Sequence, residues 1–168
     1  MSYFVCGLIS LAGADSEVRE AEARRISCEA LKTGMSVQLG ANIVQPLVLK
    51  IVGWSGGPDT IPFLITASPL SDTSDELVSP YVLVGAPGTA KFRQNAKHIA
   101  CFFDAVFAEA HVQRVDLYVV DDFDESIRTK TIPLANLELK LLEEWEKRNE
   151  DFFFHLVLCR LEIARRRD

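Results

Sequence analysis

A long amphipathic segment from Thr89 to Ala110 constrains the fold of this chain more than any other part of the sequence. Apolar side chains recur along it at steps of three and four residues, which places them on one face of a helix. Because this face is broad and aromatic, we expect the helix to pack against a β-sheet. The side chains on this face are those of Phe92, Ala96, Ile99, Phe103, Val106 and Ala110.

Short apolar segments on both sides of this helix are typical of the strands of such a sheet. Pro46 falls inside one of them and predicts an edge or a bulge there. Two further helices are expected, at residues 16–32 and 133–148. The sequence therefore predicts one α+β domain over residues 1–168, with a mixed, mostly antiparallel sheet and about three helices packed on it. The expected strands are 3–11, 35–39, 43–52, 62–67, 77–84, 115–120, 127–132 and 152–163.

The composition limits the partners and the compartment. With 48% hydrophobic residues in 168, the chain has enough apolar material for one core. Its 18 basic and 24 acidic residues give a formal net charge of −6, which disfavours nucleic acid and anionic membranes as partners and suits a basic protein surface. The four cysteines are far apart and include no Cys-x-x-Cys pair, a usage typical of a reduced compartment. We therefore expect a cytoplasmic protein without an export signal or a membrane span.

The turn Gly85-Ala-Pro-Gly-Thr-Ala-Lys91, which precedes the long helix, is similar to the Walker A motif of P-loop NTPases. In that motif backbone amides and a lysine surround phosphate groups, and a hydroxyl side chain holds magnesium. Here Ala90 replaces the second glycine, and Phe92 stands where the hydroxyl residue belongs. We favour a turn that leads into a core helix. The alternative is a small enzyme or a degenerate nucleotide-binding domain that uses Gly85, Gly88 and Lys91.

An acidic segment follows the strand predicted at 115–120. Oxygen-rich clusters suit magnesium or calcium, but the spacing is not that of an EF-hand, so we predict no metal site and keep a cation site as an alternative. A solvated loop explains the carboxylates. A second alternative is contact with a partner, in which carboxylates attract a basic surface and an aromatic side chain anchors it. The residues concerned are Asp121, Asp122, Phe123, Asp124 and Glu125.

Trp54 begins a turn-rich segment, Trp54-Ser-Gly-Gly-Pro58, and is a second candidate for partner contact. Tryptophan is enriched at binding surfaces, although its indole can equally fold back over the edge of the sheet. No catalytic motif accompanies these features. The histidines have no metal-ligand spacing with each other or with a cysteine, and a nucleophile pair such as Cys101 with His155 needs a geometry that sequence alone does not give. We therefore predict a non-enzymatic protein with no cofactor.

The segment from Phe102 to Asp124 resembles a pattern found among small bacterial immunity proteins that are encoded beside polymorphic toxins. A phenylalanine-rich helix face at Phe102, Phe103 and Phe107 leads through a short turn to the strand Arg114-Val-Asp-Leu-Tyr118 and the acidic segment. The resemblance covers this one segment and brings no catalytic residue with it. It implies an immunity protein that binds and neutralises a cognate toxin in the cytoplasm of the producing cell. An adaptor subunit whose apolar surface is covered in a homodimer or larger homo-oligomer is a further alternative.

Overall fold

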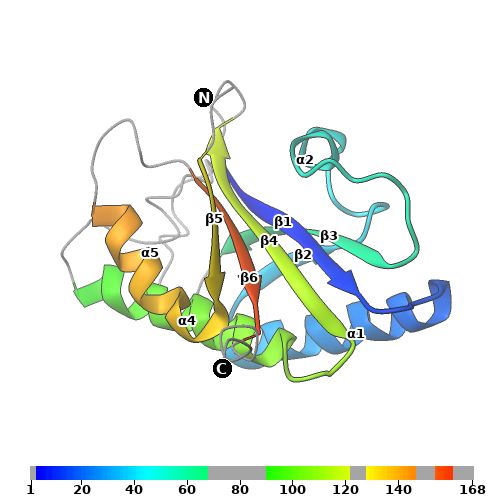
Figure 1. The fold of residues 1–168 in the computed structure, drawn as a ribbon, viewed down its shortest axis with the longest axis horizontal. Helices are drawn as coiled ribbons and strands as arrows, with labels where there is room; N and C mark the ends of the chain where they lie inside the picture. Colours follow the sequence, from blue (N-terminus) through cyan, green and yellow to red (C-terminus); the bar gives the residue numbers. More distant parts are fainter. Residues whose placement is uncertain (1–2, 68–89, 122–127, 147–153, 161–168) are drawn as a thin grey trace, which may run out of the picture.

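The structure is a computed structural model that describes residues 3–67, 90–121, 128–146 and 154–160. Its strands are β1 Tyr3–Leu11, β2 Ser36–Leu39, β3 Thr60–Ala67, β4 Val112–Asp121, β5 Arg128–Pro133 and β6 Phe154–Cys159. They form one open sheet in the order β2-β3-β1-β4-β6-β5 (Figure 1). Neighbouring strands are antiparallel except β5 and β6, which are parallel. The predicted α+β class with a mixed, mostly antiparallel sheet is confirmed.

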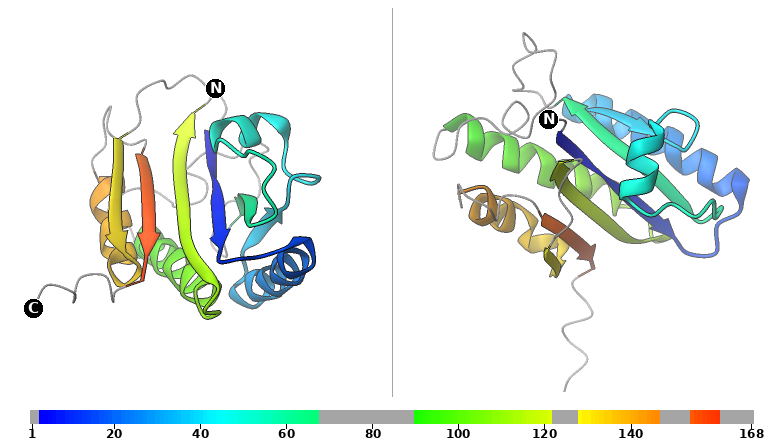
Figure 2. Two further views of the ribbon diagram at one scale, coloured as in Figure 1. Left: turned by 45° about the vertical axis from the view of Figure 1, so that its right-hand side comes forward. Right: turned by 90° about the horizontal axis from the view of Figure 1, so that it is seen from above.

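Three helices line one face of the sheet, and a short fourth helix lies on the other. The three are α1 Ser16–Thr33, α4 Ala90–Val106 and α5 Leu137–Glu146, of which α5 continues the 3-10 turn η1 Leu134–Asn136. The fourth is α2 Pro46–Ile51, which Figures 1 and 2 show well away from α1 and α4. The described part of the chain thus has a helical layer on one side of the sheet and a partial cover on the other.

Alternation along the strands divides the apolar side chains between these two faces. On β1, Val5 and Ile9 belong to the main core beneath the three helices. Their neighbour Cys6 points the opposite way and packs with Val44 and Val48 around α2. This period of two is the expected consequence of strand geometry, and it leaves two apolar clusters separated by the sheet.

The ends of α1 follow the local signals in the sequence. The Asp15 side chain accepts a hydrogen bond from the backbone N–H of Val18 at 2.9 Å and caps the first turn. Gly34 ends the helix with φ of 75°, a left-handed conformation that glycine adopts without steric cost. The predicted helix at 16–32 is therefore confirmed, with one residue added at its end.

The strand predicted at 43–52 is wrong, because this segment contains α2. Pro46 occupies the start of the helix, where its missing N–H costs nothing. Val44, Val48 and Val52 are all buried and recur every four residues, which is a helical spacing. Their β-branched side chains suggested a strand, but the spacing outweighs that preference.

The long helix ends at Val106, earlier than the predicted Ala110. Arg25 on α1 reaches its last turn and donates hydrogen bonds to the carbonyl oxygens of Ala105 and Val106, both at 2.8 Å. The Ala105 oxygen also accepts a bond from the backbone N–H of Ala108 at 3.2 Å, and the guanidinium adds a cap on the C-terminus from another element. Glu22 in turn holds Arg25 through an ion pair of 2.8 Å. The apolar face predicted for this helix is confirmed at its buried positions Ala96, Ile99, Phe103 and Val106.

The remaining expectations are confirmed with changed bounds or lie outside the described residues. The strands expected at 35–39, 62–67, 115–120, 127–132 and 152–163 appear as β2 to β6. The helix expected from Pro133 starts as η1 and becomes α-helical at Leu137. The strand expected at 77–84 lies outside the described residues.

Candidate functional site

A polar cluster lies on the face of the sheet that α1, α4 and α5 do not cover. Val115, Leu117 and Val119 of β4 point into the main core, so the alternate residues Arg114, Asp116 and Tyr118 point to the opposite face. Arg114 donates two hydrogen bonds to the Asp116 carboxylate, from Nε at 2.9 Å and from Nη2 at 2.7 Å. The two side chains thus form a bidentate pair on a single strand.

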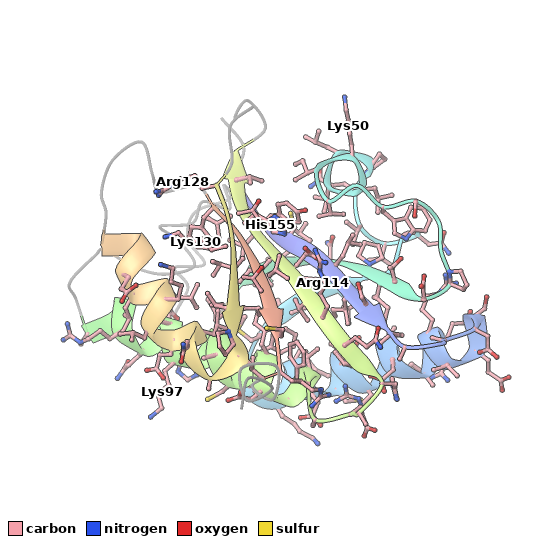
Figure 3. All side chains as sticks on the ribbon, viewed as in Figure 1. Lys50, Lys97, Arg114, Arg128, Lys130 and His155 are labelled. Carbon is pink, nitrogen blue, oxygen red and sulfur yellow. The ribbon has the colours of Figure 1, made fainter. Side chains whose placement is uncertain are left out.

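His155 on β6 joins this pair to two further strands. Its Nε2 lies 2.7 Å from Oδ1 of Asp116, and its Nδ1 lies 3.1 Å from the hydroxyl oxygen of Thr129 on β5. Its ring stacks on Tyr118 with centroids 4.0 Å apart and planes 6° from parallel. Figure 3 labels Arg114 and His155 on their strands. We call Arg114, Asp116, Tyr118, Thr129 and His155 the sheet-face cluster.

Burial and charge act in opposite directions on the Asp116 carboxyl. Asp116 is 6% exposed, and this burial raises its pKa. Hydrogen bonds from His155 and Arg114, together with the charge of Arg114, outweigh the effect of burial, so that the pKa is lowered. For Tyr118, burial and the neighbouring carboxylate act together and raise the pKa of the phenol. The cluster therefore keeps Asp116 ionised and Tyr118 neutral near neutral pH.

The row from Asp116 through His155 to Thr129 brings together a carboxylate, an imidazole and a hydroxyl, the groups of a general-base relay. Two observations favour a structural function. The bidentate bonds from Arg114 already compensate the charge of Asp116, and His155 is buried with 9% exposure. Three cavities lined by described residues have walls made of side chains outside the sheet-face cluster. The cluster acts as a polar connection between β4, β6 and β5.

A local pattern in the sequence indicates the polar members of this cluster, although not how they meet. Arg114, Asp116 and Tyr118 alternate with valine and leucine in an otherwise apolar strand, and His155 interrupts another. Buried polar side chains of this kind need partners. Which partners they find depends on the strand order and on the register, and these become known only from the structure.

Of the five residues predicted to form an acidic surface, the structure describes the backbone of the first, Asp121. Asp121 is the last residue of β4 and pairs with Tyr3 on β1. Asp122, Phe123, Asp124 and Glu125 lie outside the described residues, and so do Gly85 and Gly88 of the turn similar to Walker A. Lys91 is the second residue of α4, directly after the first residue Ala90.

Trp54 is the one predicted contact residue whose side chain the structure describes. It follows α2 and packs against the cluster of valines beneath that helix, so its indole is partly buried. Its Nε1 is buried and has no hydrogen-bond partner. The indole thus folds back over the sheet, the alternative that the sequence left open, and the residue forms part of the wall of a cavity.

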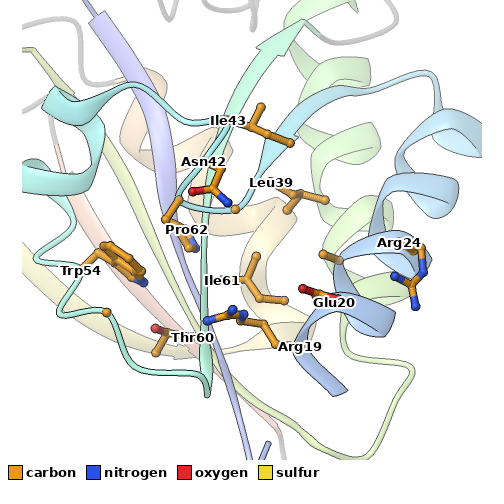
Figure 4. Close-up of a pocket in the computed structure, with 14 residues that line it drawn as sticks. Arg19, Glu20, Arg24, Leu39, Asn42, Ile43, Trp54, Thr60, Ile61 and Pro62 are labelled. Atoms are coloured by element: carbon orange, nitrogen blue, oxygen red, sulfur yellow. The ribbon is translucent and has the colours of Figure 1, made fainter. Parts of the chain in front are cut away.

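This cavity has a volume of about 500 Å³ and lies between α1, the segment after β2 and the start of β3 (Figure 4). Its charged lining consists of Arg19, Glu20 and Arg24, all on α1. Leu39 and Ile61 supply apolar walls. No sequence motif indicated this cavity, because its lining comes from four separate segments.

Within the described residues, no group of three or more histidine, cysteine or acidic side chains is arranged to hold a metal ion. The helices described here include none with the length and apolar character needed to cross a membrane. Comparisons with protein-family models, with curated proteins and with solved structures found no match.

Proposed function

We propose that this chain is a non-enzymatic protein-binding module of the immunity-protein type, which binds a basic protein surface through the acidic residues that follow β4. The partner on this proposal is a cognate bacterial toxin, bound in the cytoplasm of the producing cell. The contact residues are the five of the acidic segment, Asp121, Asp122, Phe123, Asp124 and Glu125, and Trp54 is an additional candidate.

The observation that carries the proposal is the position of Asp121. It ends a strand of ten residues that pairs with β1 over its length and with β6 at residues 115–119. A strand held on both sides fixes the point from which the acidic residues extend, and fixed elements reduce the entropy that binding costs. The formal net charge of −6 supports attraction to a basic partner.

The arrangement of the sheet-face cluster supports the non-enzymatic part of the proposal. Its only carboxylate, Asp116, is engaged by Arg114 and His155 within the protein. A general base needs a carboxylate or an imidazole that can reach a substrate proton. Both groups here are buried and already bonded.

The test is binding to the protein encoded next to this chain, by co-expression, pull-down and calorimetry. Reversal of three charges, Asp121→Lys, Asp122→Lys and Asp124→Lys, is expected to weaken binding about tenfold or more, and to do so most strongly at low salt. The matched control reverses three exposed acids elsewhere, Glu17, Glu109 and Glu138, and changes the net charge equally. Binding that both triple variants weaken equally would show a dependence on net charge only and would contradict the proposed surface.

The competing hypothesis of nucleotide binding is tested on the same protein. A clear rise in melting temperature with magnesium and ATP or GTP, abolished by Lys91→Ala, would contradict the proposal. We expect no such rise, and we expect the Lys91→Ala variant to bind the partner as tightly as the original chain does.

A further inference from the structure

The outer edge of the sheet at β2 is open in the described chain. β2 is the first strand in the sheet order, and β3 is its one neighbour among the described strands (Figure 2). Gly40 donates a hydrogen bond to the carbonyl oxygen of Pro62, and in an antiparallel ladder the bonds to one neighbour come from alternate residues. Gln38 therefore bonds towards β3. The N–H and C=O groups of Val37 and Leu39 point outwards and bond to no described residue.

β2 lacks the usual protection of an edge strand. Edge strands that stay single carry charged side chains or proline, which oppose pairing with another chain. The sequence of β2, Ser36–Leu39, contains neither. The register shift between Ser36 and Val37 disturbs the start of the strand and leaves the rest in regular pairing with β3. The edge can therefore accept a further strand.

A groove of about 310 Å³ lies between this edge and the last turns of α1. Its apolar lining consists of Ala30, Leu31, Met35 and Val37, and the rest of its described lining is serine, threonine and glutamine. Leu31 is 80% exposed, although Ala30 and Met35 beside it are buried. The N–H of Met35 bonds to the carbonyl oxygen of Ala30 at 2.9 Å, which fixes the link from α1 to β2. An apolar side chain from another molecule can therefore fill a preformed groove.

The chemistry of this face suits a second copy of the chain. Each copy carries a formal net charge of −6, so two copies repel each other unless their contact surfaces are uncharged. β2 and the described lining of the groove provide such a surface. The outward groups of β2 are also complementary to themselves. When two copies of β2 run antiparallel, Val37 of one copy faces Leu39 of the other, and the two residues exchange hydrogen bonds.

We propose that two copies of this chain associate through β2, about a two-fold axis at Gln38 that joins their sheets into one. The axis is perpendicular to the sheet, so both α1 helices lie on the same side, and the Leu31 side chain of each copy covers the groove of the other. The strand and the groove offer far fewer residues than the roughly 20–30 on each side of a stable interface, so the dimer is weak and depends on concentration. This inference is independent of the acidic surface proposed for partner binding.

Sedimentation equilibrium of the intact chain, from about 1 μM to about 1 mM, tests the association. The weight-average mass is expected to rise from 18.7 kDa towards twice that value. Leu31→Glu is expected to weaken dimerisation about tenfold or more, because it brings two carboxylates together across the axis. The matched control is Leu139→Glu, which adds the same charge at a 62% exposed position on α5 and is expected to change dimerisation by less than about threefold.

Amide hydrogen exchange and a crosslink locate the contact on β2. The N–H groups of Val37 and Leu39 are expected to exchange more slowly as the concentration rises, while the N–H of Gln38, which bonds to β3, is protected at every concentration. Gln38→Cys is expected to give a disulfide-linked dimer under mild oxidation, because the two positions face each other across the axis. Serine replaces the exposed Cys28 and Cys101 in this variant, and the same background with Gln38 intact is the control.

Three outcomes overturn the proposal. One is a chain that stays monomeric at the highest concentration and gives no crosslink with Gln38→Cys. Another is that Leu31→Glu weakens the dimer no more than Leu139→Glu does, which would place the contact elsewhere. The third concerns the amides of Val37 and Leu39. Their protection at the lowest concentration would show that the edge is covered within one chain, and protection only after addition of a different protein would assign the edge to that protein.

Discussion

Replacement of Asp116 by asparagine tests the energetics of the sheet-face cluster. The carboxylate receives two bonds from Arg114, at 2.9 and 2.7 Å, and lies 2.7 Å from Nε2 of His155. Asparagine keeps one oxygen but places an NH₂ group where the second oxygen accepted. It therefore loses the charge and at least one hydrogen bond, and it points a donor at other donors.

The expected loss of stability depends on how far the Asp116 and Arg114 side chains are exposed to water. Loss of one member of a fully buried ion pair costs roughly 3–5 kcal/mol. Here the Asp116 side chain is 9% exposed while that of Arg114 is 52% exposed, so the guanidinium regains water when its partner is lost. We therefore discount the figure and expect a decrease of about 2 kcal/mol in the free energy of unfolding, or about 30-fold in the unfolding constant.

The pH dependence of stability tests this prediction most directly. The folded-state pKa of Asp116 lies below the ordinary 3.8, so its stabilisation is complete above that value and is lost as the pH falls through the lower folded-state pKa. Asparagine has no such titration. In urea unfolding followed by circular dichroism, the difference between the original chain and the variant should be largest at about pH 7 and should shrink as the pH falls below 3.8.

Asp104→Asn is the matched control. Asp104 is exposed on α4, and partial burial raises the pKa of its carboxyl, the opposite direction from Asp116. Its replacement is expected to leave stability near pH 7 unchanged or slightly increased. A difference for Asp116→Asn that stays the same at low and neutral pH, or equal effects of the two substitutions, would refute the assignment of the stabilisation to the charged carboxylate.

Two further predictions concern β1. Gly7→Ala is expected to lower the free energy of unfolding by about 3 kcal/mol or more. A Cβ at this position meets the carbonyl oxygen of Asp116 and comes within 2.7 Å of the Phe63 ring. A variant of unchanged stability in thermal unfolding would contradict this close approach. Burial raises the pKa of the Cys6 thiol to about 12, so iodoacetamide at about pH 8 is expected to modify the exposed Cys101 and to spare Cys6 until the protein unfolds, as mass spectrometry would detect. The same shift lowers stability as the pH rises from 9.0 towards about 12, since the thiol ionises first in the unfolded chain.

The elements that the sequence predicted well are those with local signals. The cap at Asp15, the glycine at Gly34 and the apolar face of α4 each depend on residues a few positions apart. The strand predicted at 43–52 is wrong because its β-branched residues favour a strand, and Pro46, which predicts an edge or a bulge within a strand, instead starts α2. Only the four-residue spacing of Val44, Val48 and Val52 indicated a helix.

The sites depended on information that no local pattern contains. Thr129 and His155 meet because β5 and β6 are parallel neighbours, and Asp116 meets His155 because β4 pairs on the other side of β6. The cavity at Trp54 lies where β2 ends opposite Phe63, so that the first residues of β3 extend beyond β2. The strand order decides each of these contacts, and the spacing of residues along the chain does not reveal that order.

The central position of β1 determines when this chain can finish folding during synthesis. β1 lies between β3 and β4, and Tyr3 pairs with Asp121, so β1 waits for residues more than 100 positions later in the chain to leave the ribosome. Such long-range pairing places a domain among the slower folders, which need milliseconds to seconds. Once β3 has been made it can cover one edge of β1, but the edge that pairs with β4 stays open to other chains, so a nascent chain that stalls before β4 is prone to aggregate.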